Sequence, residues 1–181
     1  MARRGVRIGA VAAATVLAVG LVPGTAHAAT GNVNDPRGDA PKVADITKLK
    51  FKNGTYRATG VITVPHRKLK KLAFTNLEIK PKRNAGWIYI VSIHRDAAGK
   101  VTDKTLAWQQ GDDPSTYTPV PCTGIRQAWI GKRTKISVPQ SCLTKHHGTR
   151  LKARAGILAR VGPGHDFYDD RTRYTRYLKR G

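Results

Sequence analysis

Acidic residues, cysteines and long apolar runs are all scarce in this chain of 181 residues. Aspartate and glutamate number 11 against 33 lysines and arginines, which gives a formal net charge of +22 at pH 7. The two cysteines are 20 residues apart, which is too wide for a closely spaced thiol metal site. Beyond residue 28 no apolar run is long enough to span a membrane. These absences leave a strongly basic chain with no membrane anchor after its N-terminal segment.

Residues 1–28 have the composition and order of a secretory signal peptide. Three arginines precede Ile8–Val22, an uncharged run of 15 apolar and small residues. This run is shorter than the roughly 20 residues that span a bilayer, and segment 26–28 has small residues at the two positions that signal peptidase reads. We therefore expect cleavage after Ala28 and secretion, with the product extracellular or associated with the cell wall. Loss of the three arginines lowers the formal charge from +22 to +19.

Cys122 and Cys142 are predicted to form a disulfide. In an oxidising compartment an isolated pair of cysteines is most simply a bridge. Closing a loop of this length stabilises a fold by about 3 kcal/mol in the chain-entropy model. The bridge would join two expected strands, 124–130 and 133–138, which are hairpin partners across Gly131-Lys132.

Strict alternation of side chains marks a half-buried strand after residue 46. Its two faces consist of Thr47, Leu49 and Phe51 on one side and Lys48, Lys50 and Lys52 on the other. The Asn-Gly pair at 53–54 then predicts a hairpin, because a type I′ turn needs positive φ at both positions. The resulting register sets Phe51 opposite Tyr56 and Leu49 opposite Ala58.

Short strands separated by turn residues continue to the C-terminus. They are expected near 73–80, 87–94, 101–109, 124–130, 133–138, 151–161 and 172–178. Helical periodicity is scarce, so the pattern predicts an all-β fold, an antiparallel β-sandwich of the jelly-roll kind with one disulfide. Residues 29–181 would form this single domain, with residues 29–45 as an exposed lead-in rich in turn formers.

Several local motifs together suggest a relationship to known proteins. They are Asp35-Pro36-x-Gly38-Asp39, Ala44-Asp45-Ile46, Val138-Pro139-x-Ser141-Cys142-Leu143 and Tyr177-Leu178-Lys179-Arg180-Gly181. With them the chain resembles a group of small secreted actinobacterial proteins, and more distantly the β-sandwich class of DOMON domains and family-9-like carbohydrate-binding modules. This resemblance implies a sandwich fold and a binding role, and it names no ligand. Haem is not expected, because Met1 is the only methionine.

Three carboxylates, those of Asp35, Asp39 and Asp45, lie within eleven residues of an otherwise basic chain. Oxygen ligands on a loop suit Ca²⁺, which accepts six to eight oxygens in irregular geometry. The spacing is not that of an EF-hand, so a second interpretation stays open. In that interpretation Asp35 and Asp39 form Asx turns, and Asp45 pairs with a lysine.

The distribution of basic residues is the most functionally suggestive feature. Six lysines on an expected strand face and in the connection at 65–71 are candidate anion-binding residues: Lys48, Lys50, Lys52, Lys68, Lys70 and Lys71. Such a surface attracts polyanions with an affinity that falls steeply with salt, so an anionic cell-wall polymer or polysaccharide is the expected partner. Sequence-specific nucleic-acid binding is not expected, because neither an RNP-like motif nor a recognition helix is present. The alternative is a surface that only maintains solubility or protects strand edges.

Recognisable catalytic motifs are absent from the sequence. It contains no Gly-x-Ser-x-Gly, His-Glu-x-x-His or Cys-x-x-Cys. We therefore expect a secreted, non-enzymatic binding or envelope-associated protein. The alternative is a secreted hydrolase with a dispersed Asp/His site, for which His94 with Asp96 and His165 with Asp166 are candidate acid–base pairs. A carboxylate–histidine pocket would favour the hydrolase, whereas a continuous basic surface would favour binding.

Overall fold

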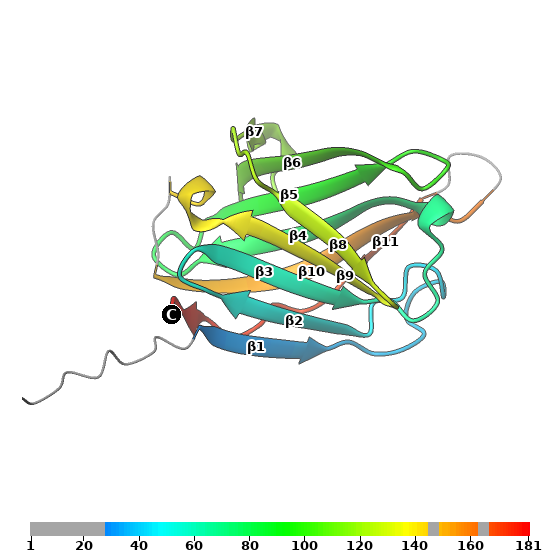
Figure 1. The fold of residues 1–181 in the computed structure, drawn as a ribbon, viewed down its shortest axis with the longest axis horizontal. Coiled ribbons are helices and arrows are strands. Elements are labelled where there is room, and N and C mark those ends of the chain that lie inside the picture. The colour runs from blue at the N-terminus through cyan, green and yellow to red at the C-terminus, as the bar shows by residue number, and fades with distance from the viewer. Residues whose placement is uncertain (1–27, 145–148, 163–166) are drawn as a thin grey trace, which may run out of the picture.

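Two antiparallel sheets pack face to face in the computed structural model, which describes residues 28–144, 149–162 and 167–181 (Figure 1). The five-stranded sheet has the order β1 (Ala29–Asn34), β2 (Lys48–Asn53), β3 (Arg57–Thr63), β9 (Arg133–Pro139) and β8 (Arg126–Ile130). The second sheet has the order β11 (Phe167–Arg171), β10 (Arg150–Arg160), β4 (Leu72–Pro81), β5 (Trp87–Arg95), β6 (Val101–Gln110) and β7 (Thr118–Pro119), with β12 (Leu178–Lys179) also paired to β10. The predicted antiparallel β-sandwich is therefore confirmed.

Helical structure is limited to three single 3₁₀ turns within the described residues: η1 (Leu69–Lys71), η2 (Pro114–Thr116) and η3 (Gln140–Cys142). None of them has the length or the apolar character needed to cross a bilayer. The predicted signal peptide lies outside the described residues except for Ala28.

The core between the sheets is built by the alternation that the sequence displays. Leu49 and Phe51 of β2 are fully buried, and they face the equally buried Leu77 of β4 and Val91 of β5 among other residues of the core. The two sheets approach each other closely at Gly60 of β3, where an added Cβ would lie 2.5 Å from a methyl carbon of Leu77. Glycine at this position therefore lets the sheets close on each other.

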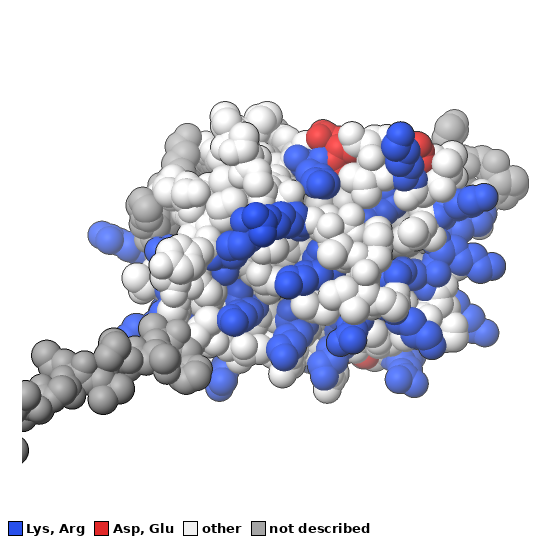
Figure 2. Space-filling model, in the orientation of Figure 1, with Lys and Arg blue, Asp and Glu red and all other residues white. Residues whose placement is uncertain are grey.

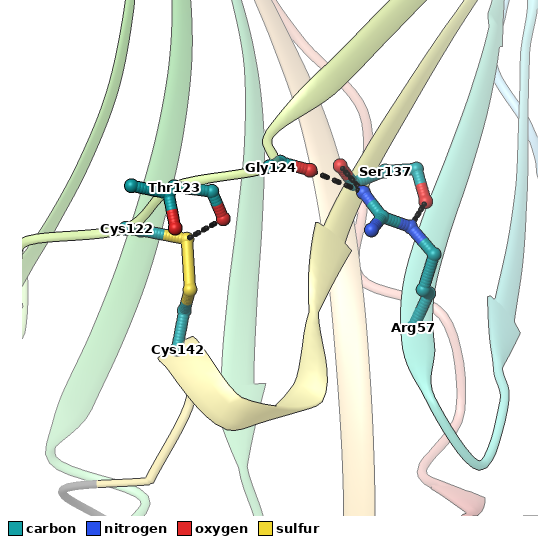
Figure 3. The surroundings of a disulfide bond; sticks show 6 residues. All are labelled: Arg57, Cys122, Thr123, Gly124, Ser137 and Cys142. Atoms are coloured by element: carbon teal, nitrogen blue, oxygen red, sulfur yellow. Dashed lines mark hydrogen bonds between the residues drawn. A yellow bond between two sulfur atoms is a disulfide. The ribbon is translucent and has the colours of Figure 1, made fainter.

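The predicted disulfide between Cys122 and Cys142 is confirmed, with a Cα–Cα distance of 5.5 Å (Figure 3). It joins the segment before β8 to η3, which follows β9, at the open end of the hairpin. The hairpin turn itself is Gly131-Lys132, as expected, with Ile130 paired to Arg133. Gly131 has a φ of +54°, a conformation that glycine adopts without strain.

A cation–π stack ties β8 to the second sheet at the end of the sandwich where β5 finishes. The guanidinium of Arg95 lies 4.4 Å from the Trp129 ring centroid, and that of Arg67 lies 4.5 Å from it. Arg95 is 4% exposed, and this burial, with the nearby charge of Arg67, lowers its pKa to about 10. Cation–π attraction offsets part of the cost of burying this arginine.

The hairpin between β2 and β3 forms, but its predicted turn and register are wrong. Phe51 pairs with Gly60 and Leu49 with Ile62. The last pair before the turn is Asn53 with Ala58, so four residues, Gly54 to Arg57, separate the paired positions instead of two. The side chain of Asn53 explains the difference, since it is buried and donates to the carbonyls of Thr149 and Leu178. The even shift in register keeps the same side chains in the core.

The exposed lead-in predicted for residues 29–45 is wrong at both of its ends. Residues 29–34 form β1, which pairs with β2 along its full length. Gly31 of β1 makes room for Leu178, a methyl carbon of which would lie 3.2 Å from an added Cβ. Ala44 and Asp45 are also buried, so only the middle of the segment is exposed.

The strand predicted for 172–178 is also wrong, apart from its last residue, which begins β12. This segment runs beside β10, but threonine hydroxyls take the place of part of the backbone ladder. The N–H groups of Ala153 and Ala155 donate to the hydroxyls of Thr175 and Thr172, each at 3.1 Å. The hydrogen bonds to β10 therefore come from residues three apart, Thr172 and Thr175, whereas the side chains of a regular strand alternate with a period of two.

Candidate anion-binding face

The outward side chains of the five-stranded sheet form a surface that we call the basic face. Strand pairing arranges them in rows that cross all five strands, such as Asn32, Lys50, Val61, Lys135 and Ala128. The seven cations of these strands are Lys48, Lys50, Lys52, Arg57, Arg126, Arg133 and Lys135. None of the five strands contains an acidic residue. Figure 2 shows lysines and arginines spread over this face, with acidic residues visible only near its margins.

A groove of about 480 Å³ crosses the basic face where β3, β9 and β8 lie side by side. Its walls carry four cations, Arg57, Arg126, Lys135 and Lys104, the last of them contributed by β6 of the other sheet. A second hollow of about 520 Å³ shares Arg57 and Lys135 with the groove and extends past Tyr56, which is 84% exposed. The two hollows together make a continuous, positively charged depression.

Arg57 is the most firmly held cation in this depression (Figure 3). Its Nε donates to the hydroxyl of Ser137 at 2.7 Å, and its Nη2 donates to the carbonyls of Ser137 at 2.7 Å and Gly124 at 2.6 Å. Burial lowers the pKa of Arg57 from its usual value, and the charge of Arg126 adds to the effect. The hydrogen bonds leave Nη1 without a partner among the described residues, so this edge of the guanidinium can face an anion.

The disulfide supports this arrangement because it fixes the chain just before Gly124. The Thr123-Gly124 turn, in which Gly124 has a φ of +85°, presents the carbonyl that accepts from Arg57. The disulfide and the guanidinium of Arg57 are thus connected through a single turn.

The structure places the two predicted lysine groups differently. Lys48, Lys50 and Lys52 are exposed on the outer side of β2, within the basic face. Lys68, Lys70 and Lys71 are also exposed but lie at η1 in the β3–β4 connection, outside the sheet surface. The backbone of Leu69 there packs against Gly99 of the β5–β6 turn.

None of the four cations that line the groove belongs to the predicted anion-binding set: they are Arg57, Arg126, Lys135 and Lys104. Arg57 and Arg126 each occupy an outward position at the start of a strand. Alternation within each strand could have indicated them. Lys104 could not have been found in this way, because it reaches the groove from the other sheet.

The aspartates predicted as calcium ligands only partly converge. Oxygen atoms of Asp35, Asp39 and Asp170 lie within 4.8 Å of one another, so a residue of β11 takes the place expected for Asp45. Asp45 instead accepts the N–H of Gly38 at 3.1 Å, and Asp170 accepts that of Ile46 at 2.8 Å.

Negative charge is concentrated where Asp35, Asp39 and Asp170 meet. Burial, together with the charges of Asp170, Asp39 and Asp45, raises the pKa of Asp35 to about 6. The charge of Arg173 acts in the opposite direction and has the smallest of these effects. The cluster therefore holds more negative charge than its surroundings compensate.

Two arginines on the outer side of the second sheet, Arg154 and Arg171, are paired with carboxylates instead. Arg154 of β10 donates to the buried carboxylate of Glu78 at 2.5 Å and to Asp112 at 2.9 Å. The hydroxyl of Tyr174 donates to Glu78 at 3.3 Å, and burial, with the charge of Glu78, raises the pKa of Tyr174. Glu78, Asp112, Arg154 and Arg171 line a small cavity of about 270 Å³. The guanidinium of Arg154 also lies 4.8 Å from the ring centroid of Tyr174.

The histidines predicted for a hydrolase are not all described. His165 and Asp166 lie outside the described residues. His94 lies on the outer side of β5, with its Nε2 3.4 Å from the hydroxyl of Thr105 and its ring 5.8 Å from that of Phe74. The hydrolase interpretation stays a prediction.

Fold and surface define the class of protein: a disulfide-bonded, two-sheet antiparallel β-sandwich with one strongly basic outer face. The disulfide fits an extracellular protein. Comparison with models of protein families, with curated proteins and with solved structures finds no match. The resemblance to actinobacterial secreted proteins and to DOMON-like modules therefore stays a prediction.

Proposed function

We propose that this protein is a secreted, non-enzymatic binding protein whose basic face binds an anionic polymer, such as a charged cell-wall polymer or an acidic polysaccharide. The observation that carries the proposal is that the five strands of this face hold seven cations and no carboxylate. With no acidic residue in those strands to pair with, these charges remain available to a ligand.

The spacing of the cations suits a linear polymer with repeated charges. Side chains two residues apart on a strand are about 6.6 Å apart, and neighbouring strands are about 4.8 Å apart. Lys48, Lys50 and Lys52 thus form a row along β2, and Lys135 lies two strands away across β3. A polymer lying on this surface would contact several cations at once and release its condensed counterions, which makes binding strongly dependent on salt.

Hydrogen-bond donors lie between the cations of the groove. The hydroxyls of Thr59 and Ser137 are 2.9 Å apart and line the groove with Arg57, whose Nη1 has no partner among the described residues. Hydroxyls and a planar guanidinium suit phosphate, sulfate or carboxylate oxygens. The groove would therefore hold one anionic group of the polymer while the lysine row attracts its neighbours.

The proposal is tested with two variants that lose the same number of positive charges. One loses them from the basic face, and the control loses them elsewhere. The test variant carries Lys50→Gln, Lys52→Gln and Lys135→Gln. The control variant carries Lys82→Gln, Arg83→Gln and Lys179→Gln, three exposed cations attached to the second sheet. Binding to heparin, a polyanion probe, is measured by titration between low and high salt, with neutral dextran as the comparison polymer.

We expect the test variant to bind heparin more weakly than the control, with the slope of log K against log salt reduced by roughly 2 to 3. The control should lose little heparin affinity, because its three residues attract the polymer only through weak long-range electrostatics. Equal losses of heparin affinity in both variants would contradict binding by the basic face and would show that the net charge of the protein alone determines binding. Tight binding to dextran that salt does not weaken would point to a neutral sugar instead.

A further inference from the structure

The aspartate cluster is the strongest feature that the basic face does not explain. Asp35 and Asp39 belong to the connection between β1 and β2, whereas Asp170 belongs to β11 of the other sheet. Among the described residues none of the three forms an ion pair with lysine or arginine, although the chain has 33 of these. In so basic a protein, unpaired carboxylates gathered at one point indicate that something else balances their charge.

A buried polar atom gives independent evidence for a missing partner. Asp45 is 7% exposed, and its Oδ1 has no hydrogen-bond partner among the described residues. The Oδ2 of Asp35 is also inaccessible and without a partner. Leaving a buried carboxylate oxygen unsatisfied costs free energy, and the charge of Asp45 acts on both Asp35 and Asp170.

We propose that Asp35, Asp39 and Asp170 bind a calcium ion, with the buried carboxylate of Asp45 contributing negative charge beside it. Ligand oxygens lie about 2.4 Å from Ca²⁺, so oxygens on opposite sides of the ion are about 4.8 Å apart. The three carboxylate oxygens lie within 4.8 Å of one another, which places them inside this limit. The set contains only oxygens, which favours calcium over zinc.

Calcium at this point would connect the two sheets along one edge of the sandwich. Two hydrogen bonds already cross there: the Ile46 N–H donates to Asp170, and the Tyr168 hydroxyl donates to the Asp39 carbonyl at 2.7 Å. An ion shared by Asp35 and Asp170 would replace repulsion between the sheets with attraction. Binding should therefore stabilise the fold as well as neutralise the cluster.

The experiment uses the mature protein, residues 29–181, freed of metal with a chelator and then titrated with calcium chloride. Calorimetry measures binding, and thermal unfolding measures the change in Tm. Extracellular modules bind calcium with dissociation constants of about 10⁻⁴–10⁻³ M, so 10 mM calcium should raise Tm by roughly 3–10 °C. Magnesium at the same concentration should raise it less, and an equal rise would overturn the assignment to calcium.

Two variants separate ligation from damage to the fold. Asp35→Asn should raise the Tm of the metal-free protein, because it relieves repulsion, and should abolish the calcium-induced rise. Asp103→Asn removes an exposed carboxylate of β6 far from the cluster in the chain and should keep the full rise. The proposal fails if the wild type shows no saturable binding, if both variants respond equally, or if Asp35→Asn lowers the metal-free Tm.

Discussion

The outer faces of the two sheets differ in whether their arginines are paired with carboxylates. On the second sheet Arg154 is paired with Glu78 and Asp112, and Arg171 with Asp169 at 2.8 Å. On the five-stranded sheet the cations have no acidic neighbour in their strands. Where arginine is neutralised it holds the structure together, and where it is left unpaired it remains available for a ligand.

Like charges placed side by side on the basic face repel one another and weaken the fold. Lys50 and Lys135, for example, both pair with Val61 of β3, one from each side, so only one strand separates the two charges. The second sheet shows that this chain can place carboxylates beside its cations. Their absence from the basic face therefore supports a role in binding over a role in stability.

The largest expected difference between the two faces is in how much a substitution lowers the free energy of unfolding. Glu78→Ala would leave Arg154, whose side chain is 18% exposed, without its closest partner. Removing one member of a buried pair costs about 3 kcal/mol, even though Asp112 still contacts Arg154. Urea unfolding measures this loss. The Lys50, Lys52 and Lys135 glutamine variant should change stability by less than about 0.5 kcal/mol. Comparable losses in both variants would remove the distinction between the faces.

Removing the disulfide at the end of the basic face is expected to have a smaller effect on stability. Replacing Cys122 and Cys142 by alanine should lower the free energy of unfolding by about 3 kcal/mol or somewhat less. Because the bridge also fixes the turn at Gly124, heparin binding by the folded variant should weaken through Arg57. The wild type treated with reductant provides the matching measurement. Unchanged heparin affinity in the alanine variant and in the reduced wild type would show that the disulfide stabilises the fold but does not affect binding.

Local patterns in the sequence predicted those parts of the fold that local contacts determine. The lysine alternation of β2 and the Gly131-Lys132 hairpin are each set by neighbouring residues, and both were predicted correctly. The turn at Asn53 was not, because its side chain bonds to Thr149 and Leu178, about a hundred residues further along the chain. No short-range pattern contains that information.

The same limit applies to the two candidate sites. The sequence indicated Asp35 and Asp39, but not Asp170, which only the pairing of β11 with β10 brings to the cluster. The lysines of β2 were found from their spacing, whereas Lys104 enters the groove through the packing of the sheets. In both sites the nearby residues could be predicted, and the distant ones required the fold.

The most direct test of the central claim is to map where a polyanion binds. The chain from residue 29 to residue 181, labelled with ¹⁵N, is titrated with a short heparin oligosaccharide at low salt, and amide chemical shifts are followed. We predict that the largest changes fall on β2, β3, β8 and β9, with Arg57 and Lys135 among them, and that they vanish at high salt. Changes concentrated on β4, β5 and β10, or spread evenly over both sheets, would contradict the account.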